Sequence, residues 1–272
     1  MGILAFVALS ACGAGPKGLA YRALDEGAYG TARSALVEAT REDPDDREAW
    51  WLLGVVEKRL GAYAGARAAF GRVAALAPED PAPRIQIGFT WELERNYGEA
   101  EASYRLATRI APDRAYPFRV LGARLVRWGD AQGAISPLER AVSLDDSDAE
   151  TWNTLALAHH VAGDDASAAR VFERGLKRHP GSRRLALGRA ALDVHAGKFA
   201  DALARYRALL AVDADDPDLH VACAITLAEL GRRGEAIAEF EAAVRVANEP
   251  AAYEARLRAY REGGESPTTP AE

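Results

Sequence analysis

A period of 34 residues runs through this sequence and limits what it can fold into more than any other feature. One column of the repeat holds only alanine: Ala32, Ala66, Ala100, Ala134, Ala168, Ala202 and Ala236. Four residues later every position is large and apolar or aromatic: Leu36, Phe70, Tyr104, Leu138, Phe172, Tyr206 and Phe240. Twelve residues before each alanine every position is small: Ala20, Gly54, Gly88, Gly122, Ala156, Ala190 and Ala224. Three unbroken columns predict stacked copies of one supersecondary unit, none of which can bury its apolar face alone.

Each copy is predicted to be a pair of helices. Hydrophobic residues make up 49% of the chain, much of them alanine, which is the best helix former, and runs of strand length rich in Val, Ile and Thr are scarce. Glycines at the middle of five copies mark the turn between the two helices: Gly61, Gly129, Gly163, Gly197 and Gly231. Acidic segments such as 43–46 and 213–216 separate one copy from the next. The expected fold class is therefore all-α.

The pattern resembles the tetratricopeptide repeat (TPR). Residues 47–80 carry its signature nearly throughout, with Trp50, Leu53-Gly54, Ala66, Phe70 and Pro78. The resemblance implies a right-handed superhelical solenoid of seven 34-residue helix-turn-helix repeats with a C-terminal capping helix. The repeats would be 13–46, 47–80, 81–114, 115–148, 149–182, 183–216 and 217–250.

The remaining segments complete the predicted domain organisation. Residues 1–11 are interpreted as a lipoprotein signal peptide and 12–16 as the lipid attachment site with a short joint. The solenoid would occupy 17–250, the capping helix 251–262, and a disordered tail 263–272.

Two motifs adjoin near the N-terminus. Leu9-Ser10-Ala11-Cys12 resembles the lipobox of bacterial lipoproteins, which implies lipidation of Cys12 and anchoring to the outer membrane on its periplasmic side. The alternative is an apolar N-terminus without this role, and no Lys or Arg occurs in the first eleven residues. Residues 13–18 match G-x-G-x-x-G, but the following segment has helical rather than strand spacing, so a dinucleotide site is not expected.

Composition and missing motifs exclude several classes of function. The net charge is −6 with both signs dispersed, which argues against binding to a nucleic-acid backbone. The metalloprotease, C-x-x-C, nucleophile-elbow and phosphate-loop motifs are missing from the sequence, so we expect no enzyme activity and no cofactor. His160 and His195 occupy neighbouring slots of successive repeats and could approach each other, but two ligands do not make a metal site, and none is predicted.

The resemblance places a binding groove on the first helices of the repeats. Tyr21 and two pairs spaced by four residues, Trp51 with Val55 and Ile85 with Phe89, would form an apolar patch there. Arg119 and Asn153 occupy the corresponding slots of later repeats. Such a patch is typical of a site for an apolar peptide or helix of a partner protein. The alternative is that these side chains pack against neighbouring helices of the solenoid.

Together these features predict a non-catalytic, lipid-anchored scaffold for protein partners. TPR lipoproteins of this build suggest secretin or pilus assembly (pilotin-like) as the pathway. The alternative is an adaptor for peptidoglycan hydrolases or other envelope enzyme complexes. The sequence carries no indication of the partner's identity or of the oligomeric state.

Overall fold

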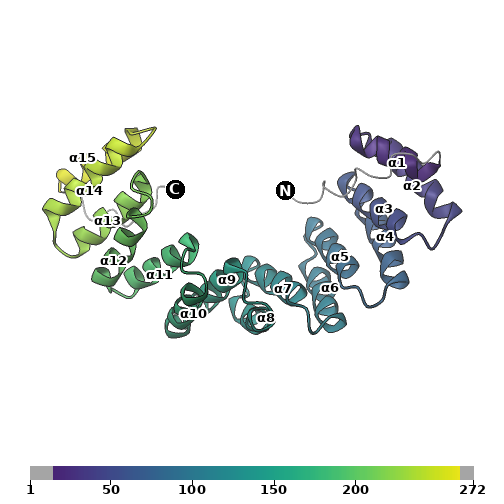
Figure 1. Ribbon diagram of the computed structural model, residues 1–272, viewed down its shortest axis with the longest axis horizontal. Coiled ribbons are helices and arrows are strands. Elements are labelled where there is room, and N and C mark those ends of the chain that lie inside the picture. The colour runs from purple at the N-terminus through teal and green to yellow at the C-terminus, as the bar shows by residue number, and fades with distance from the viewer. Residues whose placement is uncertain (1–14, 264–272) are drawn as a thin grey trace. The chain divides into compact units, whose positions relative to one another are not determined.

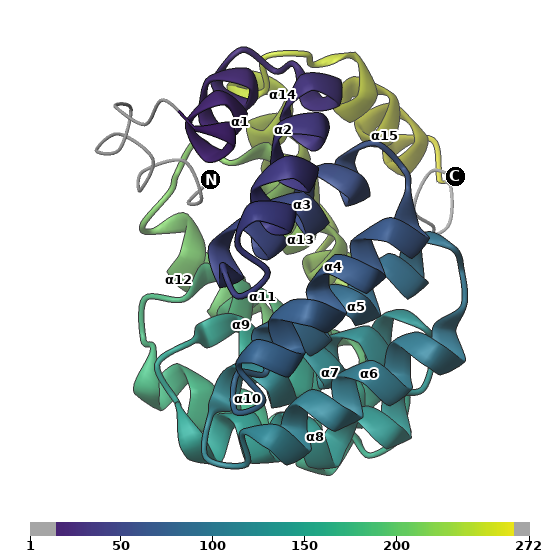
Figure 2. The ribbon, with the colours of Figure 1, turned by 90° about the vertical axis from the view of Figure 1, so that its right-hand side faces the viewer.

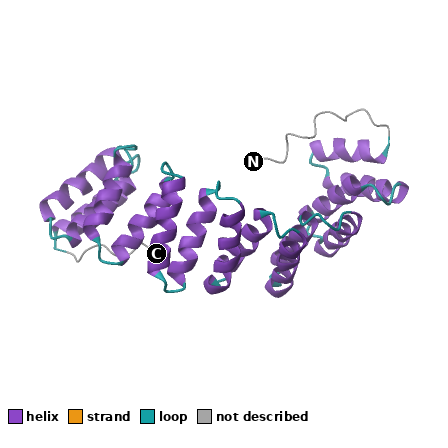
Figure 3. Cartoon of the chain, turned by 60° about the horizontal axis from the view of Figure 1, so that its bottom comes forward, coloured by secondary structure: helices purple, strands orange, loops and turns teal. Residues whose placement is uncertain are grey.

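The computed structural model describes residues 15–263, and every regular element within that range is a helix (Figures 1 and 3). The helices of the first three repeats are α1 (Pro16–Asp25), α2 (Tyr29–Glu42), α3 (Arg47–Arg59), α4 (Tyr63–Leu76), α5 (Ala82–Leu93) and α6 (Tyr97–Ile110). The next four repeats contain α7 (Ala115–Arg127), α8 (Ala131–Leu144), α9 (Ala149–Val161), α10 (Asp165–Arg178), α11 (Arg183–His195), α12 (Phe199–Leu210), α13 (Pro217–Glu229) and α14 (Arg233–Val246). A final helix, α15 (Ala251–Arg261), follows them. The predicted all-α fold of seven helix pairs and a cap is confirmed.

The chain divides into two compact units, which the sequence did not predict. Unit 1 is Met1–Arg124 and unit 2 is Leu125–Glu272, so the boundary falls inside the first helix of the fourth repeat. Within unit 1 each helix packs against the next one along the chain from α1 to α6, and Figure 2 shows α3 to α6 in this succession. Within unit 2 the same sequential packing runs from α8 to α15, and α9 also contacts α11 directly.

The three sequence columns form the core of both units. All seven alanines of the first column are fully buried, and so are six of the seven large residues that follow them, while Tyr206 is 8% exposed. The small column is needed because the large side chains lie against its backbone. A Cβ added to Gly54 would come within 2.7 Å of the Phe70 ring. The period of 34 therefore records a close helix–helix contact repeated along the chain.

The turn between paired helices uses a left-handed residue. Gly61 has φ +76°, and the equivalent glycines of five other repeats also have positive φ. Arg95 occupies this slot in the third repeat with φ 58°, the only non-glycine among residues 15–263 with positive φ. An L-residue is strained in this region because its Cβ approaches the carbonyl oxygen.

The last helix covers the end of the repeat array, as expected. The Tyr260 ring lies 5.3 Å from that of Phe240 between centroids, and Arg233 Nη2 donates to the carbonyl oxygen of Tyr260 at 3.0 Å. Cys12 and most of the predicted tail lie outside the described residues. Among residues 15–263, no helix combines the length and apolar character needed to cross a membrane.

Candidate partner-binding surface

In unit 1, polar side chains join the first helix of one repeat to the first helix of the next. Lys17 Nζ lies 2.8 Å from Asp46 Oδ2 and 2.6 Å from Glu48 Oε2, and the Tyr21 hydroxyl donates to Glu48. Hydrogen bonds from Lys17 and Tyr21 hold the pKa of the Glu48 carboxyl below its usual value. Burial, together with the Glu48 carboxylate, raises the pKa of Tyr21 to about 12. Tyr21 is therefore present as a hydroxyl donor that ties α1 to α3.

Lys58 makes the corresponding link from α3 to α5. Its ammonium nitrogen donates to Gln86 Oε1 at 2.6 Å and lies 5.9 Å from the centre of the Phe70 ring. Burial lowers the pKa of Lys58. Among the described residues, no carboxylate lies within ion-pairing distance of Lys58 in unit 1. Lys58 is thus a partly desolvated cation, and its hydrogen-bond acceptor, the Gln86 amide, is neutral.

Three predicted groove residues, two on the helix that carries Lys58 and one on α5, keep part of their surface open. Trp51 and Phe89 are half-buried and pack edge-to-face on Phe70 and Tyr104, with centroid distances of 5.3 and 5.6 Å. Val55, between Trp51 and Lys58 along α3, is 37% exposed. Spacings of four and three residues place Trp51, Val55 and Lys58 on one face of that helix.

Two other predicted groove residues are buried in the solenoid. Ile85 is 1% exposed and Asn153, in unit 2, is 5% exposed. Asn153 faces the next first helix at a position without a side chain, since a Cβ on Gly188 would lie 3.2 Å from its Oδ1. At these two slots the structure favours packing between neighbouring helices over exposure to a partner.

Two arginine side chains each lie over an aromatic ring, and the ring below Arg124 belongs to the predicted groove. Arg119 is half-buried, with its guanidinium 5.5 Å from the centre of the Tyr116 ring. The guanidinium of Arg124 lies 5.0 Å from the Phe89 ring centre, and its Nε is 3.2 Å from Glu92 Oε2. Sequence reasoning missed Arg124 and Lys58 because it took its candidate residues from only two slots of each first helix. Extending the face of α3 by one further turn would have included Lys58.

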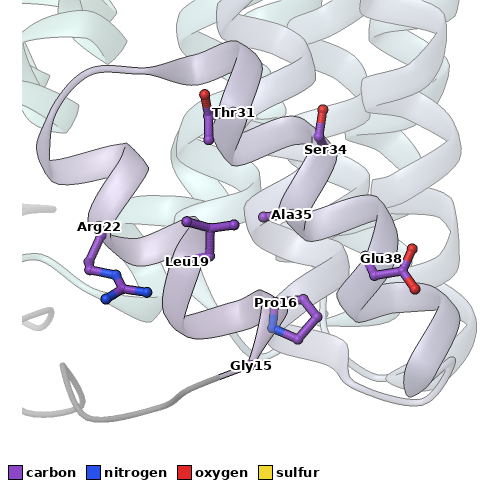
Figure 4. Close-up of a pocket in the computed structure, with 8 residues that line it drawn as sticks. All are labelled: Gly15, Pro16, Leu19, Arg22, Thr31, Ser34, Ala35 and Glu38. Atoms are coloured by element: carbon purple, nitrogen blue, oxygen red, sulfur yellow. The ribbon is translucent and has the colours of Figure 1, made fainter.

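A shallow cavity of about 460 Å³ opens between α1 and α2 (Figure 4). Its lining residues all come from this first helix pair and from the residue before it: Gly15, Pro16, Leu19, Arg22, Thr31, Ser34, Ala35 and Glu38. Leu19 is 44% exposed and projects toward the cavity. The lining holds one basic and one acidic side chain, both exposed, and no nucleophile paired with a base.

Antiparallel helix pairs stacked in series, with part of the first-helix face open, define a helical-repeat protein. Three family models described as tetratricopeptide repeat match residues 17–81, 149–192 and 194–259, which together make up more than half of the chain. The chain belongs to the tetratricopeptide repeat family. This membership implies a scaffold for protein–protein interactions.

One curated relative and several solved structures are similar to the chain. Cellulose synthase 2 operon protein C of Komagataeibacter xylinus is 30% identical over 159 residues, which cover 56% of this chain and 12% of the relative. The chain therefore spans only about an eighth of that relative's length. A tetratricopeptide repeat protein from Parabacteroides merdae ATCC 43184 aligns over 90% of this chain and 97% of its own, with a TM-score of 0.55 and 16% identity. The MamA protein aligns over 61% of this chain and 90% of its own, with a TM-score of 0.52 and 17% identity. At these identities the two structures support the fold alone.

Proposed function

We propose that unit 1 binds an apolar segment of a partner protein that also carries a carboxylate. The binding surface consists of Trp51, Val55, Lys58 and Phe89, and is called here the α3–α5 surface. The observation that carries the proposal is the position of Lys58, which shares a helix face with the exposed Val55 and the half-buried Trp51 and whose half-buried ammonium faces a neutral amide. A partner carboxylate would supply the missing counter-ion, while apolar side chains would cover Trp51 and Phe89.

The energetics favour such a ligand over a purely apolar one. Burying an ammonium group without a counter-ion is unfavourable, and a fully apolar ligand would desolvate Lys58 further. A carboxylate placed against Lys58 would offset that cost, and the low local dielectric would strengthen the pair. The specificity of the surface would therefore come from one acidic group set among apolar contacts.

A peptide-display selection on the purified full chain tests this proposal. Selected peptides are expected to combine apolar residues with an acidic side chain or a free C-terminal carboxylate. Their affinity, measured by fluorescence anisotropy, should fall at least about tenfold in Val55→Asp. The introduced carboxylate would repel the carboxylate of the ligand, and the apolar contact of Val55 would be lost.

The matched control is Val37→Asp on α2. Val37 is 39% exposed, about as much as Val55, but it lies on α2, the second helix of its repeat, and not on α3 or α5. Equal losses in the two variants, or unchanged binding in Val55→Asp, would contradict the assignment. If the selected peptides bind Lys58→Gln as tightly as they bind the parent chain, the partner's carboxylate makes no contribution and that part of the proposal is wrong.

We also propose that Cys12 anchors the chain to the outer membrane, with the repeats on the periplasmic side. The support is the sequence alone, since Leu9 and Ala11 precede Cys12 as a lipobox requires. The Cys12→Ala variant should move from the membrane fraction to the soluble fraction and lose incorporation of an alkyne-labelled fatty acid. Cys223→Ala is the control, because Cys223 is a buried thiol that cannot be acylated in the folded chain. Membrane retention of Cys12→Ala would overturn the anchor.

The pathway is proposed to be an assembly of the cell envelope. Secretin or pilus assembly rests on the architecture of an anchored repeat array, and an adaptor for peptidoglycan hydrolases is the alternative. The name of the curated relative adds a cellulose-synthesis assembly as a further candidate. Crosslinking in intact cells, followed by purification of parent and Val55→Asp chains, distinguishes the three. The partner of interest is the component that crosslinks to the parent chain and is lost in the variant.

A further inference from the structure

Three metal-ligating side chains converge in unit 2, far along the sequence from the α3–α5 surface. They are His160 in the last turn of α9, Asp165 at the start of α10, and His195 at the end of α11. One ligand atom from each lies within 4.8 Å of the other two. His160 Nδ1 is 2.5 Å from Asp165 Oδ1, and His195 Nε2 is 3.6 Å from Asp165 Oδ2. The two imidazole rings are 5.0 Å apart between centroids and nearly perpendicular.

The repeat architecture holds these three residues in place. The first helices of the fifth and sixth repeats, α9 and α11, pack directly against each other, which brings their C-terminal ends together. Gly163, with φ +85°, reverses the chain after α9, and the Asp164 side chain caps α10 by accepting from Ser167 N at 2.9 Å. The turn between α9 and α10, which the fold requires, therefore places Asp165 between the two histidines.

The donor set fits a divalent transition-metal ion. Two imidazole nitrogens and one carboxylate oxygen are the ligand types found in zinc sites that keep a coordination position open. A tetrahedral zinc ion would need these atoms about 3.4 Å apart, which follows from metal–ligand bonds of about 2.1 Å. Side-chain rotation is available to reach that spacing, because the His160, Asp165 and His195 side chains are 33%, 40% and 64% exposed.

The charge at the cluster also favours a cation. Asp165 carries a negative charge between two imidazoles that are acceptors for metal in their neutral form. Asp164 adds a second carboxylate next in sequence, although its Oδ2 faces His159 Nδ1 at 3.8 Å. Leu157 and Val161 are exposed on the same end of α9, so the site borders an apolar surface.

We propose that His160, Asp165 and His195 bind one divalent transition-metal ion, with Zn²⁺ as the ion that best matches the ligands. The ion connects helices of two consecutive repeats and leaves at least one coordination position for water or for a donor atom of a partner. Hard cations such as Mg²⁺ prefer oxygen ligands, so a donor set with two imidazole nitrogens disfavours them. Sequence analysis brought only the two histidines near each other, at neighbouring slots of successive repeats, and did not identify Asp165, which lies just after the turn, as a third ligand.

Calorimetric titration of the metal-free full chain, without a polyhistidine tag, tests the site with Zn²⁺ as the probe. One equivalent is expected to bind, and His195→Asn should weaken the affinity at least about tenfold because one of three ligands is lost. Most of the His195 side chain is in solvent, and circular dichroism should show an unchanged fold. A parallel titration with Mg²⁺ should give no saturable binding.

The matched control is His179→Asn, which removes a histidine outside the cluster. His179 Nε2 lies 2.8 Å from the carbonyl oxygen of Asp146 and has no part in the three-residue group. Its variant should keep the parent affinity for Zn²⁺. Failure of the parent chain to bind Zn²⁺ would overturn the proposal. Unchanged affinity in His195→Asn, or an equal loss in both variants, would also overturn it.

Discussion

At the scale of single residues, the repeat is most informative where one copy departs from it. Six repeats place glycine in the left-handed turn after the first helix, and the third places Arg95 there with φ 58°. The Arg95→Gly variant should raise the free energy of unfolding by about 1 kcal/mol, which is the order of the left-handed penalty for an L-residue. The midpoint of urea denaturation measures this gain.

The reciprocal change at an equivalent turn serves as the control for Arg95. Gly61→Arg should lower the midpoint of urea denaturation, because Gly61 has φ +76°. A Cβ at this position would meet no atom within 4 Å, so the backbone conformation and not crowding accounts for the glycine. A lower midpoint in Arg95→Gly would show that the arginine side chain contributes more than its backbone strain costs.

Sequence reasoning at this scale succeeded where a column has one physical cause. The alanine and aromatic columns predicted the core because each position meets the same neighbour in every repeat. The groove slots are less uniform, since Trp51 is half-exposed whereas Asn153, at the same slot, is covered by the helix that carries Gly188. Exposure there depends on the side chain of the following repeat, which a single column does not contain.

At the scale of elements, the last helix protects a core that the repeats alone would leave open. The Tyr260 ring packs on Phe240, and the Arg233 guanidinium lies 5.0 Å from the Tyr260 ring centre. Tyr260→Ala should destabilise the docking of α15 by about 3 kcal/mol, the usual cost of truncating a buried aromatic side chain. Limited proteolysis should then cut within 251–261 faster than in the parent chain. Tyr260→Phe keeps the ring and should be cleaved as slowly as the parent chain. If the alanine variant and the parent were cleaved at the same rate, α15 would not act as a cap.

The boundaries of the elements followed from sequence more closely than the division into units did. The capping helix was predicted at 251–262 and spans Ala251–Arg261, and the solenoid was predicted from residue 17 and begins with α1 at Pro16. The division between Arg124 and Leu125 had no sequence signal, because the small and large columns continue through Gly122 and Leu138 without a break. A uniform period describes contacts between neighbouring helices and does not mark where one unit ends and the next begins.

At the scale of the whole molecule, each unit contains its own buried apolar cluster. One includes Leu36, Leu53 and Val56 in unit 1, and another includes Leu219, Leu227 and Phe240 in unit 2. In a repeat protein, stability is approximately the sum of the repeats and their nearest-neighbour interfaces. We therefore expect a strong local perturbation to be felt mainly in its own repeat and the adjoining ones.

Asp193 offers a test of that expectation, because it is fully buried in α11 between two arginines. It accepts hydrogen bonds from Arg189 on its own helix and from Arg205 Nε on α12, the latter at 2.8 Å. Asp193→Ala would leave the buried Arg189 guanidinium with Glu173, at 3.4 Å, as its remaining partner among residues 15–263, which should cost about 3–5 kcal/mol. Hydrogen–deuterium exchange should show the largest loss of amide protection in α11 and α12, with α3 and α4 near parent values. This local effect is expected because coupling in a repeat protein acts between nearest neighbours. An equal loss of protection in every helix would instead mean that the two units unfold as one cooperative body.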